Sequence, residues 1–301
     1  MKGDTGEPET AWRAGRFDAR GGPGQLLFGR MYEDSAIEAH AFRPGGRIFC
    51  IASAGCTAID LSRQHDVVAV DVNSVQLAYA ESRASGSPPH RGAAERLLDR
   101  GRRLAPLVGW RRSRLKDFLE LEDPADQLTF WRRHLDGARF RAAMEAILSS
   151  LVLQKIYAKG FLHGLPRRLG RVMRSRLQRG FARHPNRGNS YLRSLLLGEL
   201  PTGSLPAAAG RIRFVHGDAA SFLERQPRSG FDGFSISNVL DGARDDYRAR
   251  LFAAIARTAA PEAVVVMRSF AEPPAASPKN LAAEDRAMLW GIVEVRPAGS
   301  L

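Results

Sequence analysis

The chain has 301 residues, of which 44% are hydrophobic and 26% are charged, a composition typical of a globular protein that is long enough to bury a sizeable core. Its two cysteines, Cys50 and Cys56, exclude a disulfide framework, and packing as small apolar side chains accounts for both. There is no signal-peptide pattern and no run of about 18 apolar residues, so we expect a cytoplasmic protein.

The formal net charge of +13 is concentrated in the middle of the chain. Residues 84–200 contain 24 lysines and arginines against 10 acidic residues, which leaves a net charge of −1 for all other residues together. Within this segment, the basic run of residues 155–187 has ten basic residues and no acid. A solvated helical face explains such a run, and so does an anionic partner such as a phosphate, a lipid headgroup or a carboxylate-bearing substrate.

Residues 1–46 are predicted to form a loosely ordered leader followed by a helix. We expect the helix in Leu26–Phe42, "LLFGRMYEDSAIEAHAF", because apolar residues recur there at helical spacing.

Residues 47–83 predict the first half of a Rossmann-like βαβ unit. The apolar run Ile48–Ala52 lies between glycine-rich and small-residue turns, which predicts a buried strand. A helical pattern begins at Cys56, and a second strand is predicted over Val67–Val70, directly before Asp71. Strand, small-residue turn, helix, strand and acid in this order are typical of a nucleotide-binding unit.

The turn after the first strand indicates which nucleotide is bound. It has a single glycine, Gly55, and lacks the G-x-G-x-x-G pattern whose close backbone N–H groups hold a pyrophosphate. A nucleoside without a phosphate is therefore favoured over NAD or FAD, and S-adenosylmethionine is such a ligand. Asp71 fits the acid that accepts both ribose hydroxyls, although capping of the next helix is an equal alternative.

Residues 84–200 predict only helices, from about Ala93 onwards, and hence a basic helical insertion after the second strand. Strands return in residues 201–301, at Ile212–Val215, at Phe231–Ser237 and within "AVVVMRSF" and "MLWGIVEVRP", with helices over Ala219–Arg225 and Asp245–Thr258. The predicted fold class is α/β, a Rossmann-like, doubly wound, mostly parallel sheet of the class I methyltransferase-like type.

Ligands of doubly wound sheets lie outside the carboxyl ends of the strands. Asp218 is expected to accept from the adenine amino group and the backbone of Ala219 to meet the ring, with capping of its own helix as the alternative for Asp218. The predicted cosubstrate site consists of Ser53, Ala54, Gly55, Cys56, Asp71, Asn73, Gln76, Asp218, Ala219 and Asn238.

Seven stretches spread over most of the chain carry a family resemblance: "LLFGRMYED", "IASAGCTAIDL", "VVAVDVNSVQLA", "GFARHPNRGNSYLRSLLLGEL", "FDGFSISNVLD", "VMRSF" and "EDRAMLWG". They resemble the betaine-lipid-synthase type of S-adenosylmethionine 3-amino-3-carboxypropyltransferases. This resemblance implies transfer of the 3-amino-3-carboxypropyl group to an oxygen nucleophile with release of methylthioadenosine and without a metal. The chain is shorter than the lipid-making members, so the expected acceptor is a phenolic hydroxyl of a small peptide or β-lactam natural product, with diacylglycerol as the alternative.

An oxygen acceptor must lose a proton, and a phenol with a pKa of about 10 loses it more easily than an alcohol does. The candidate catalytic residues are His184, Asp241 and Tyr191, with Glu33 and Asp34 as further candidate bases. Candidates for holding a carboxylate of the acceptor or cosubstrate are Arg187, Arg193 and Arg268. Each has a structural alternative: a surface turn for His184, a helix start for Asp241, helix packing for Tyr191 and Arg193, and an internal ion pair for Arg268.

Two other functional classes remain open. An RNA methyltransferase would explain the basic run, but its only aromatic residues for base stacking are Tyr157, Phe161 and Phe181, so we do not favour nucleic acid as the partner. A membrane-surface module would use a helical apolar stripe next to the basic run, although a helix docked on a sheet has the same pattern. The stripe consists of Ile147, Leu148, Leu151, Val152 and Ile156.

Overall fold

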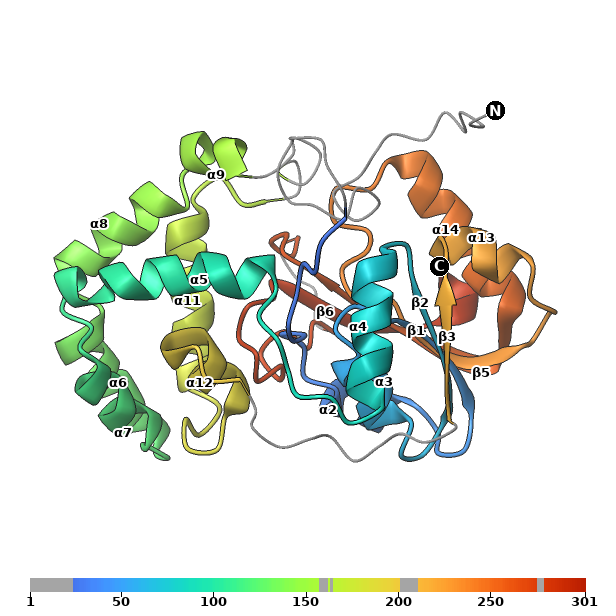
Figure 1. Ribbon diagram of the computed structural model, residues 1–301, viewed down its shortest axis with the longest axis horizontal. Helices are drawn as coiled ribbons and strands as arrows, with labels where there is room; N and C mark the ends of the chain where they lie inside the picture. Colours follow the sequence, from blue (N-terminus) through green and yellow to red (C-terminus); the bar gives the residue numbers. More distant parts are fainter. Residues whose placement is uncertain (1–23, 157–161, 163–164, 201–210, 275–278) are drawn as a thin grey trace.

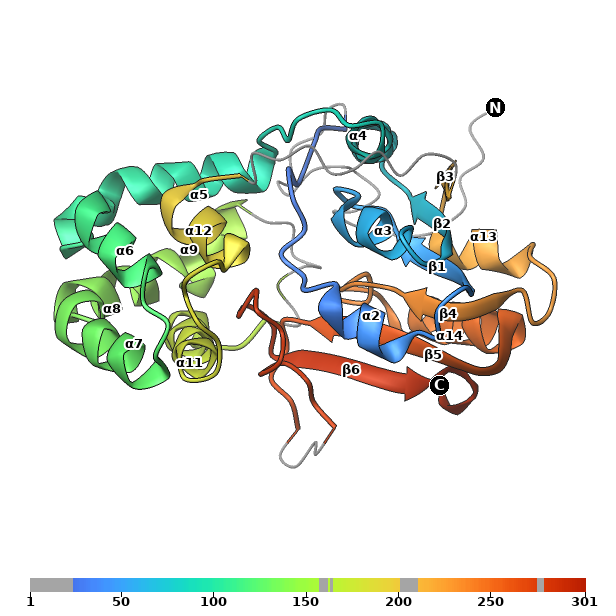
Figure 2. The ribbon, with the colours of Figure 1, turned by 90° about the horizontal axis from the view of Figure 1, so that it is seen from below.

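A computed structural model of the chain describes residues 24–156, 162, 165–200, 211–274 and 279–301. These residues form an α/β lobe built on one sheet and a helical lobe beside it (Figures 1 and 2). The first 23 residues of the predicted leader and residues 201–210, where the last predicted segment begins, lie outside the described residues.

The sheet has six strands in the order β3-β2-β1-β4-β5-β6. Neighbouring strands are parallel except for β6, which pairs antiparallel with β5 at the edge (Figure 2). The predicted doubly wound, mostly parallel fold is therefore confirmed. The strands are β1 (Arg47–Ile51), β2 (Asp66–Asp71), β3 (Ile212–His216), β4 (Phe231–Ser235), β5 (Ala259–Ser269) and β6 (Ile292–Pro297).

Helices cover both faces of this sheet, which is why its central strands are almost uniformly apolar. On one face α2 (Ala36–Ala41), α3 (Cys56–Leu61) and α4 (Ser74–Ala84) pack against side chains such as Ile48. On the other face α13 (Ala219–Glu224) and α14 (Asp245–Thr258) pack against side chains such as Phe234. A short 3-10 turn, η3 (Ala298–Ser300), follows β6.

The helix predicted over Leu26–Phe42 is wrong in its first half, because α2 begins only at Ala36. The preceding backbone bonds to other elements. The side-chain Oε1 of Gln76 on α4 accepts from the N–H groups of Leu27 and Phe28 at 2.9 and 3.1 Å. In addition, the carbonyls of Leu26 and Leu27 accept from the start of the helix at 93–104. These external partners replace the bonds that a helix would make within itself.

Every described element between residues 93 and 200 is helical, as predicted. The helical lobe has its own core, in which Phe118, Trp131 and Phe181 are fully buried and Phe118 and Phe181 have ring centroids 4.9 Å apart. Its elements are α5 (Ala93–Leu104), η1 (Ala105–Val108), α6 (Arg112–Leu119), α7 (Pro124–Phe130), the π-helical turn η2 (Trp131–Leu135), α8 (Ala138–Ile147), α9 (Ser150–Ile156), α11 (Leu169–Phe181) and α12 (Ser190–Leu197).

Helix α11 docks the helical lobe on the α/β lobe. The buried guanidinium of Arg176 donates to the carbonyls of Leu289 and Phe270, each at 2.8 Å. Four residues further on, a Cβ at Gly180 would lie 2.3 Å from the Cγ of Met288, so only glycine allows this approach. One part of the docking surface is therefore formed by α11 and the segment between β5 and β6.

Most described arginines of the basic run between 174 and 187 are paired within the protein. Arg174 pairs with Asp136, Arg176 with Glu272, Arg183 with Glu284 and Arg187 with Glu120 and Glu122. Residues 157–161 and 163–164, which include Tyr157 and Phe161, lie outside the described residues. The acidic partners of these arginines thus lie elsewhere in the helical lobe and in the α/β lobe.

The apolar stripe near the basic run is partly exposed: Ile147 has 48% and Leu151 74% of its surface accessible. Leu153, two residues after Leu151, is buried, and the side chain of Ile156 lies outside the described residues. Across the described part of the chain, no helix combines the length and apolarity needed to cross a membrane.

Candidate functional site

The topological switch point of the sheet lies between β1 and β4. From β1 the chain continues to β2 and β3 on one side, whereas β4 and β5 are added on the other side. Ligands of open α/β sheets bind in the crevice outside the strand ends at such a point. Ser53 follows β1 and Ser237 follows β4, and both have the left-handed backbone that non-glycine residues rarely adopt, with φ of 44° and 52°. Such conformations cluster at ligand sites.

The turn after β1 is tightly packed from behind. Gly55 has φ of 82°, and a Cβ there would lie 3.2 Å from both the Cα and the Cβ of Ala80 on α4. Ala54 is fully buried, and Cys56 begins α3 with its Sγ accepting from the N–H of Met31 at 3.4 Å. Gly55 thus allows α3 and α4 to pack closely together. Within the turn, Ser53 remains half-buried.

Asp71 ends β2 beside this turn, as predicted from the sequence. Its two carboxylate oxygens accept from the N–H groups of Ser53 and Asn73, each at 2.9 Å. Burial raises the pKa of Asp71 to about 6, against the effect of these two N–H groups, which lower it. A carboxylate oxygen can accept more than one hydrogen bond, so this arrangement is compatible with additional bonds from ribose hydroxyls.

Two other residues predicted to contact the cosubstrate make hydrogen bonds within the protein. The Asn73 side chain caps α4 by accepting from Val75 and Gln76 N–H, and donates to the carbonyl of Gln25. The Gln76 side chain is buried and fixes residues 27 and 28. Their contact with a ligand stays a prediction.

Asp218 shows the capping role that the sequence left open. Its Oδ1 accepts from the N–H of Ser221 in α13 at 2.8 Å, and its Oδ2 accepts from the Tyr247 hydroxyl at 2.6 Å. Ala219, the first residue of α13, is buried. Both residues lie after β3, at the same edge of the sheet as Asp71, and an adenine contact remains a prediction for each.

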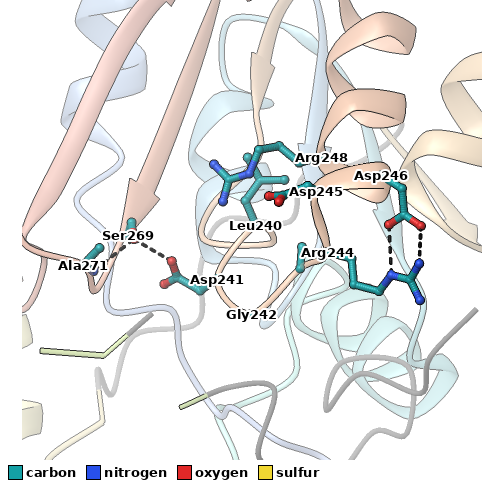
Figure 3. A pocket seen from close by; sticks show the side chains of 10 residues that line it. Leu240, Asp241, Gly242, Arg244, Asp245, Asp246, Arg248, Ser269 and Ala271 are labelled. Atoms are coloured by element: carbon teal, nitrogen blue, oxygen red, sulfur yellow. Dashed lines mark hydrogen bonds and ion pairs between the residues drawn. The ribbon is translucent and has the colours of Figure 1, made fainter. Parts of the chain in front are cut away.

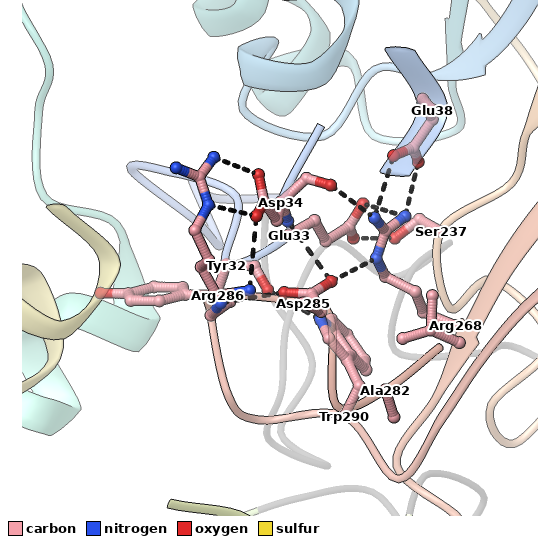
Figure 4. A network of polar contacts seen from close by, with 12 residues as sticks. Tyr32, Glu33, Asp34, Glu38, Ser237, Arg268, Ala282, Asp285, Arg286 and Trp290 are labelled. Atoms are coloured by element: carbon pink, nitrogen blue, oxygen red, sulfur yellow. Dashed lines mark hydrogen bonds and ion pairs between the residues drawn. The ribbon is translucent and has the colours of Figure 1, made fainter. Parts of the chain in front are cut away.

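A buried charge cluster lies at the other side of the switch point (Figure 4). The side chain of Arg268, fully buried at the end of β5, pairs with Glu38 at 2.5 Å and with Asp285 at 3.0 Å. Glu33 is the third carboxylate, with its Oε2 3.6 Å from Arg268. For Arg268 the structure thus shows the internal ion pair that was one of the two sequence-based alternatives.

Glu33 connects this cluster to the switch point. The Ser237 hydroxyl donates to its Oε1, whereas its Oε2 is buried without a hydrogen-bond partner. Burial raises the pKa of Glu33 to about 7, and the opposing effects of Arg268 and the Ser237 hydrogen bond are smaller. Of the candidate bases, Glu33 therefore combines a buried, incompletely bonded oxygen with a pKa near neutrality.

The carboxylate of Asp34, the neighbouring candidate base, already has its hydrogen-bond partners. Its carboxylate accepts from the guanidinium of Arg286, which with backbone N–H groups holds the pKa of Asp34 below its usual value despite burial. The adjacent Tyr32 carbonyl accepts from the indole N–H of Trp290 at 2.8 Å (Figure 4). Residues 32–34 are thus clamped by residues 285–290.

A pocket of about 770 Å³ lies beside the switch point, between the ends of β4 and β5 (Figure 3). Its lining includes Asp241, whose carboxylate accepts from the Ser269 hydroxyl at 2.5 Å, from Phe270 N–H at 3.0 Å and from the Asn238 amide at 3.2 Å. Arg248 also lines the pocket and has no ion pair within the described residues. Asn238, which bonds to Asp241, directly follows Ser237, the hydrogen-bond donor to Glu33.

The remaining candidates lie in the helical lobe or at its boundary. The Nε2 of His184 is 2.8 Å from the carbonyl of Ala283, so this ring nitrogen donates to the neighbouring lobe. Tyr191 packs against Arg30, whose guanidinium carbon is 4.5 Å from the ring centroid, and burial raises the pKa of the Tyr191 hydroxyl, which keeps it protonated. Arg187 and Arg193 share Glu120 as a partner. None of these four residues lines the described pocket.

Sequence reasoning missed Arg248, Glu38 and Asp285. The last two lie within or near motifs noted for their resemblance, but no local pattern indicates that both face Arg268. Within the described residues, no group of three or more histidines, cysteines or acids has a geometry that could hold a metal ion.

Comparisons with known proteins show similarity at the level of structure. No protein-family model matches the chain, and no curated protein sequence matches it. Solved structures that resemble it include the rRNA methyltransferase aviRa from Streptomyces viridochromogenes, with 15% identity, a TM-score of 0.30 and coverage of 93% of this chain and 88% of that one. The TehB-like SAM-dependent methyltransferase from Corynebacterium glutamicum has 11% identity, a TM-score of 0.32 and coverage of 81% and 62%.

A third similar structure, precorrin 8W decarboxylase from Methanobacterium thermoautotrophicum, has 9% identity and a TM-score of 0.31, and the match spans 78% of this chain and 61% of that one. Similarities at this level carry no argument about substrate or reaction. The function must therefore be argued from the site itself.

Proposed function

We propose that this protein is an S-adenosylmethionine-dependent transferase that moves the 3-amino-3-carboxypropyl group to an oxygen nucleophile and releases methylthioadenosine. The observation that carries this proposal is the convergence of four resemblance motifs at the switch point. Glu33 of "MYED", Ser237 of "FSISN", Arg268 of "VMRSF" and Asp285 of "EDRAMLWG" are connected by hydrogen bonds or ion pairs across more than 200 residues of sequence.

The residues present fit this cosubstrate. Asp71 and the turn Ser53–Gly55 face the ribose position of a Rossmann-like site. The buried Glu33 carboxylate offers an oxygen without a hydrogen bond, and the α-ammonium group of the amino-acid arm is a partner for it. When bound, the sulfonium supplies a leaving group that activates each of its three carbon neighbours. The protein then selects the attacked carbon by position, an effect worth up to about 7–11 kcal/mol in favourable systems.

The pocket between β4 and β5 is the proposed acceptor site. Asp241 accepts the hydroxyl proton as the acceptor oxygen bonds to the methylene carbon, the carbon–sulfur bond breaks, and its electron pair stays on the thioether sulfur. Arg248, which has no ion pair in the described residues, binds an anionic group of the acceptor. The acceptor that fits best is a small phenol with a carboxylate, as in homoserine ether formation of the isonocardicin synthase type.

The nucleoside product tests the reaction. The purified full chain is incubated with S-adenosylmethionine and a panel of phenolic and alcoholic acceptors, and the nucleosides are separated by chromatography. We expect methylthioadenosine in amounts equal to the ether formed. S-adenosylhomocysteine as the only product would instead identify a methyltransferase, acting on RNA or on a small molecule, on the same fold.

A matched pair of variants tests the acceptor pocket. Arg248→Gln should raise the KM for a carboxylate-bearing phenol about tenfold, the effect of one lost charge-assisted contact, and leave the KM for its methyl ester unchanged. Arg213→Gln, at an exposed arginine on the edge strand β3, should change neither value. An equal rise for acid and ester would contradict the role of Arg248.

Diacylglycerol is the second candidate acceptor, because Ile147 and Leu151 expose apolar surface near the basic run. A competition between the phenolic acid and detergent-dispersed diacylglycerol distinguishes the two by the ether formed. Flotation with anionic vesicles adds an independent readout, since an interfacial enzyme must bind the vesicle surface. A glycerolipid ether as the sole product would replace the acceptor assignment and leave the transfer reaction intact.

A further inference from the structure

The buried charge cluster contains more negative than positive charge. Around the side chain of Arg268 lie Glu38, Asp285 and Glu33, all at 4.0 Å or less and all almost completely buried. Asp34 has its own partner in Arg286. In the described part of the chain no further lysine or arginine pairs with Glu33, Glu38 or Asp285, so one guanidinium faces three carboxylates.

The three carboxylates are not equivalent. Glu38 accepts two hydrogen bonds from Arg268 and one from the Ser235 hydroxyl. Asp285 accepts from Arg268 and from the Ala287 N–H. Among the described residues, Glu33 accepts a hydrogen bond only from Ser237, and its buried Oε2 accepts none. A buried carboxylate that shares a single guanidinium with two other carboxylates is costly unless it is protonated or meets a further cation.

The position of Glu33 indicates which cation. Its hydrogen-bond donor Ser237 is the residue with a left-handed backbone after β4, at the switch point where the proposed cosubstrate lies. Of the parts of S-adenosylmethionine, the sulfonium and the α-ammonium group are cationic, the α-carboxylate is anionic and the adenosine part is neutral. The α-ammonium group of the amino-acid arm would therefore meet Glu33, while the ribose lies towards Asp71.

We propose that Glu33 receives the α-ammonium group of the amino-acid arm of S-adenosylmethionine and that binding of this cation expels a proton from Glu33. This inference rests on the proposed function. In the free protein the carboxyl group is neutral in mildly acidic solution. When the cation arrives, the carboxyl O–H bond breaks, the proton passes to the buffer, and the carboxylate forms an ion pair with the arm.

The environment of Glu33 supports this exchange. Burial raises its pKa to about 7, Glu38 on α2 and Asp285 before β6 add to this rise, and Arg268 on β5 and Ser237 after β4 oppose it. The thiol of Cys50 on β1 also faces the cluster, and burial raises its pKa well above the usual value, so it stays neutral. A bound cation lowers the pKa of Glu33 and therefore releases its proton.

Calorimetric titration in buffers of different ionisation enthalpy measures this proton. At about pH 6 we expect the full chain to release close to one proton more on binding S-adenosylmethionine than on binding methylthioadenosine, which lacks the arm. The comparison subtracts any proton linked to Asp71, because both ligands carry the ribose. At about pH 8.5 the difference should vanish, because Glu33 is then already ionised.

Two variants assign the proton. Glu33→Gln should abolish the difference at about pH 6, lower the affinity for S-adenosylmethionine at least tenfold at about pH 8 and leave the affinity for methylthioadenosine unchanged. Ser237→Ala keeps the carboxyl group but removes a hydrogen bond that lowers its pKa, so proton release should persist and extend to higher pH. This second variant decides the matter if Glu33→Gln does not fold.

The outcomes separate the two proposals. Binding of S-adenosylmethionine with an unchanged proton count in Glu33→Gln, or a Ser237→Ala profile that does not move, overturns the role of Glu33 and leaves the transferase proposal standing. Absence of any binding of S-adenosylmethionine by the wild-type chain overturns both. Finding S-adenosylhomocysteine as the enzymatic product changes the proposed function and does not touch the role of Glu33.

Discussion

Asp71 and Glu33 are two buried carboxylates on opposite sides of the switch point, and burial raises the pKa of each, to about 6 and about 7. Asp71 is held by two backbone N–H groups, whereas Glu33 has one hydroxyl donor and one oxygen without a hydrogen bond. At the residue scale, Asp71 is thus an oriented hydrogen-bond acceptor on the ribose side of the site. Glu33, on the other side, is a carboxylate with an oxygen that accepts no hydrogen bond.

Replacing Asp71 by Asn should weaken binding of S-adenosylmethionine by about 1–3 kcal/mol, the range for a charge-assisted hydrogen bond, while the fold is retained. In the wild-type protein, affinity should also fall as the pH drops below about 6, because protonation removes the anionic acceptor. Calorimetric titration over this pH range measures both effects. An unchanged affinity in Asp71→Asn would limit the role of the residue to holding the turns after β1 and β2.

Replacing Glu33 by Gln should stabilise the folded state in alkaline solution. The pKa of Glu33 rises from 4.5 to about 7 on folding, so between these values the folded chain keeps a proton that the unfolded chain loses, and stability falls as the pH rises. The loss is complete above about pH 7 and amounts to about 3 kcal/mol.

Urea unfolding of both proteins tests this prediction. The free energy of unfolding of Glu33→Gln minus that of the wild type should be larger at about pH 8 than at about pH 5. A difference that is independent of pH would show that Glu33 does not titrate in this window.

At the element scale, residues 24–34 show how a side chain from another element can determine local structure. The apolar spacing of Leu26–Phe42 predicts a helix, but the buried Gln76 amide bonds to both N–H groups and one carbonyl of residues 27 and 28. No local pattern reveals a partner 48 residues away in sequence.

Gln76→Ala should therefore destabilise the protein by about 3 kcal/mol, because buried backbone groups lose their partner. The matched control is Gln226→Ala, since the Gln226 amide makes one long bond of 3.4 Å, to the carbonyl of Phe222, and should cost less than about 0.5 kcal/mol. Thermal unfolding measures both. Equal effects of the two variants would contradict the role of Gln76.

The strands were predictable because their signals are local. Continuous apolar runs at Ile48–Ala52 and Val67–Val70, each bounded by turns, match β1 and β2 within a residue. Asp71 could be placed because it directly follows β2. The charge cluster could not, because Arg268 and Glu38 are 230 residues apart, and their pairing depends on how β5 and α2 pack across the sheet.

The candidate bases illustrate the same limit. Residue type alone favoured His184, whose ring the structure places against the Ala283 carbonyl. Only their surroundings distinguish Asp241 from Glu33: Asp241 lines a pocket, whereas Glu33 is a buried carboxylate with an oxygen that accepts no hydrogen bond.

At the scale of the whole molecule, the excess of basic residues helps to join the lobes. Arg176 donates to the carbonyls of Leu289, Phe270 and Ala271 and pairs with Glu272. Arg179 donates to the carbonyl of Trp290 at 2.8 Å. These arginines bond to the chain segments that flank Arg268 and Asp285, so the helical lobe is docked on the part of the α/β lobe that carries the charge cluster.

Arg176→Met should destabilise the protein by about 3 kcal/mol, because several buried carbonyls lose their donor. Arg171→Met on the same helix, at an exposed arginine, is the control and should have an effect below about 0.5 kcal/mol. Differential scanning calorimetry is the measurement, because separation of the lobes would also split the single unfolding transition into two. A stability equal to that of the control would contradict docking through Arg176.

The most direct test of the proposed site is a crystal structure of the full chain with bound S-adenosylmethionine. The adenosine is predicted to lie over the ends of β1 and β2 with its ribose hydroxyls on Asp71, and the amino-acid arm to reach Glu33 beside Ser237, with the sulfonium facing the Asp241 pocket. A nucleoside bound at any other edge of the sheet, or an arm that points away from Glu33, would contradict it.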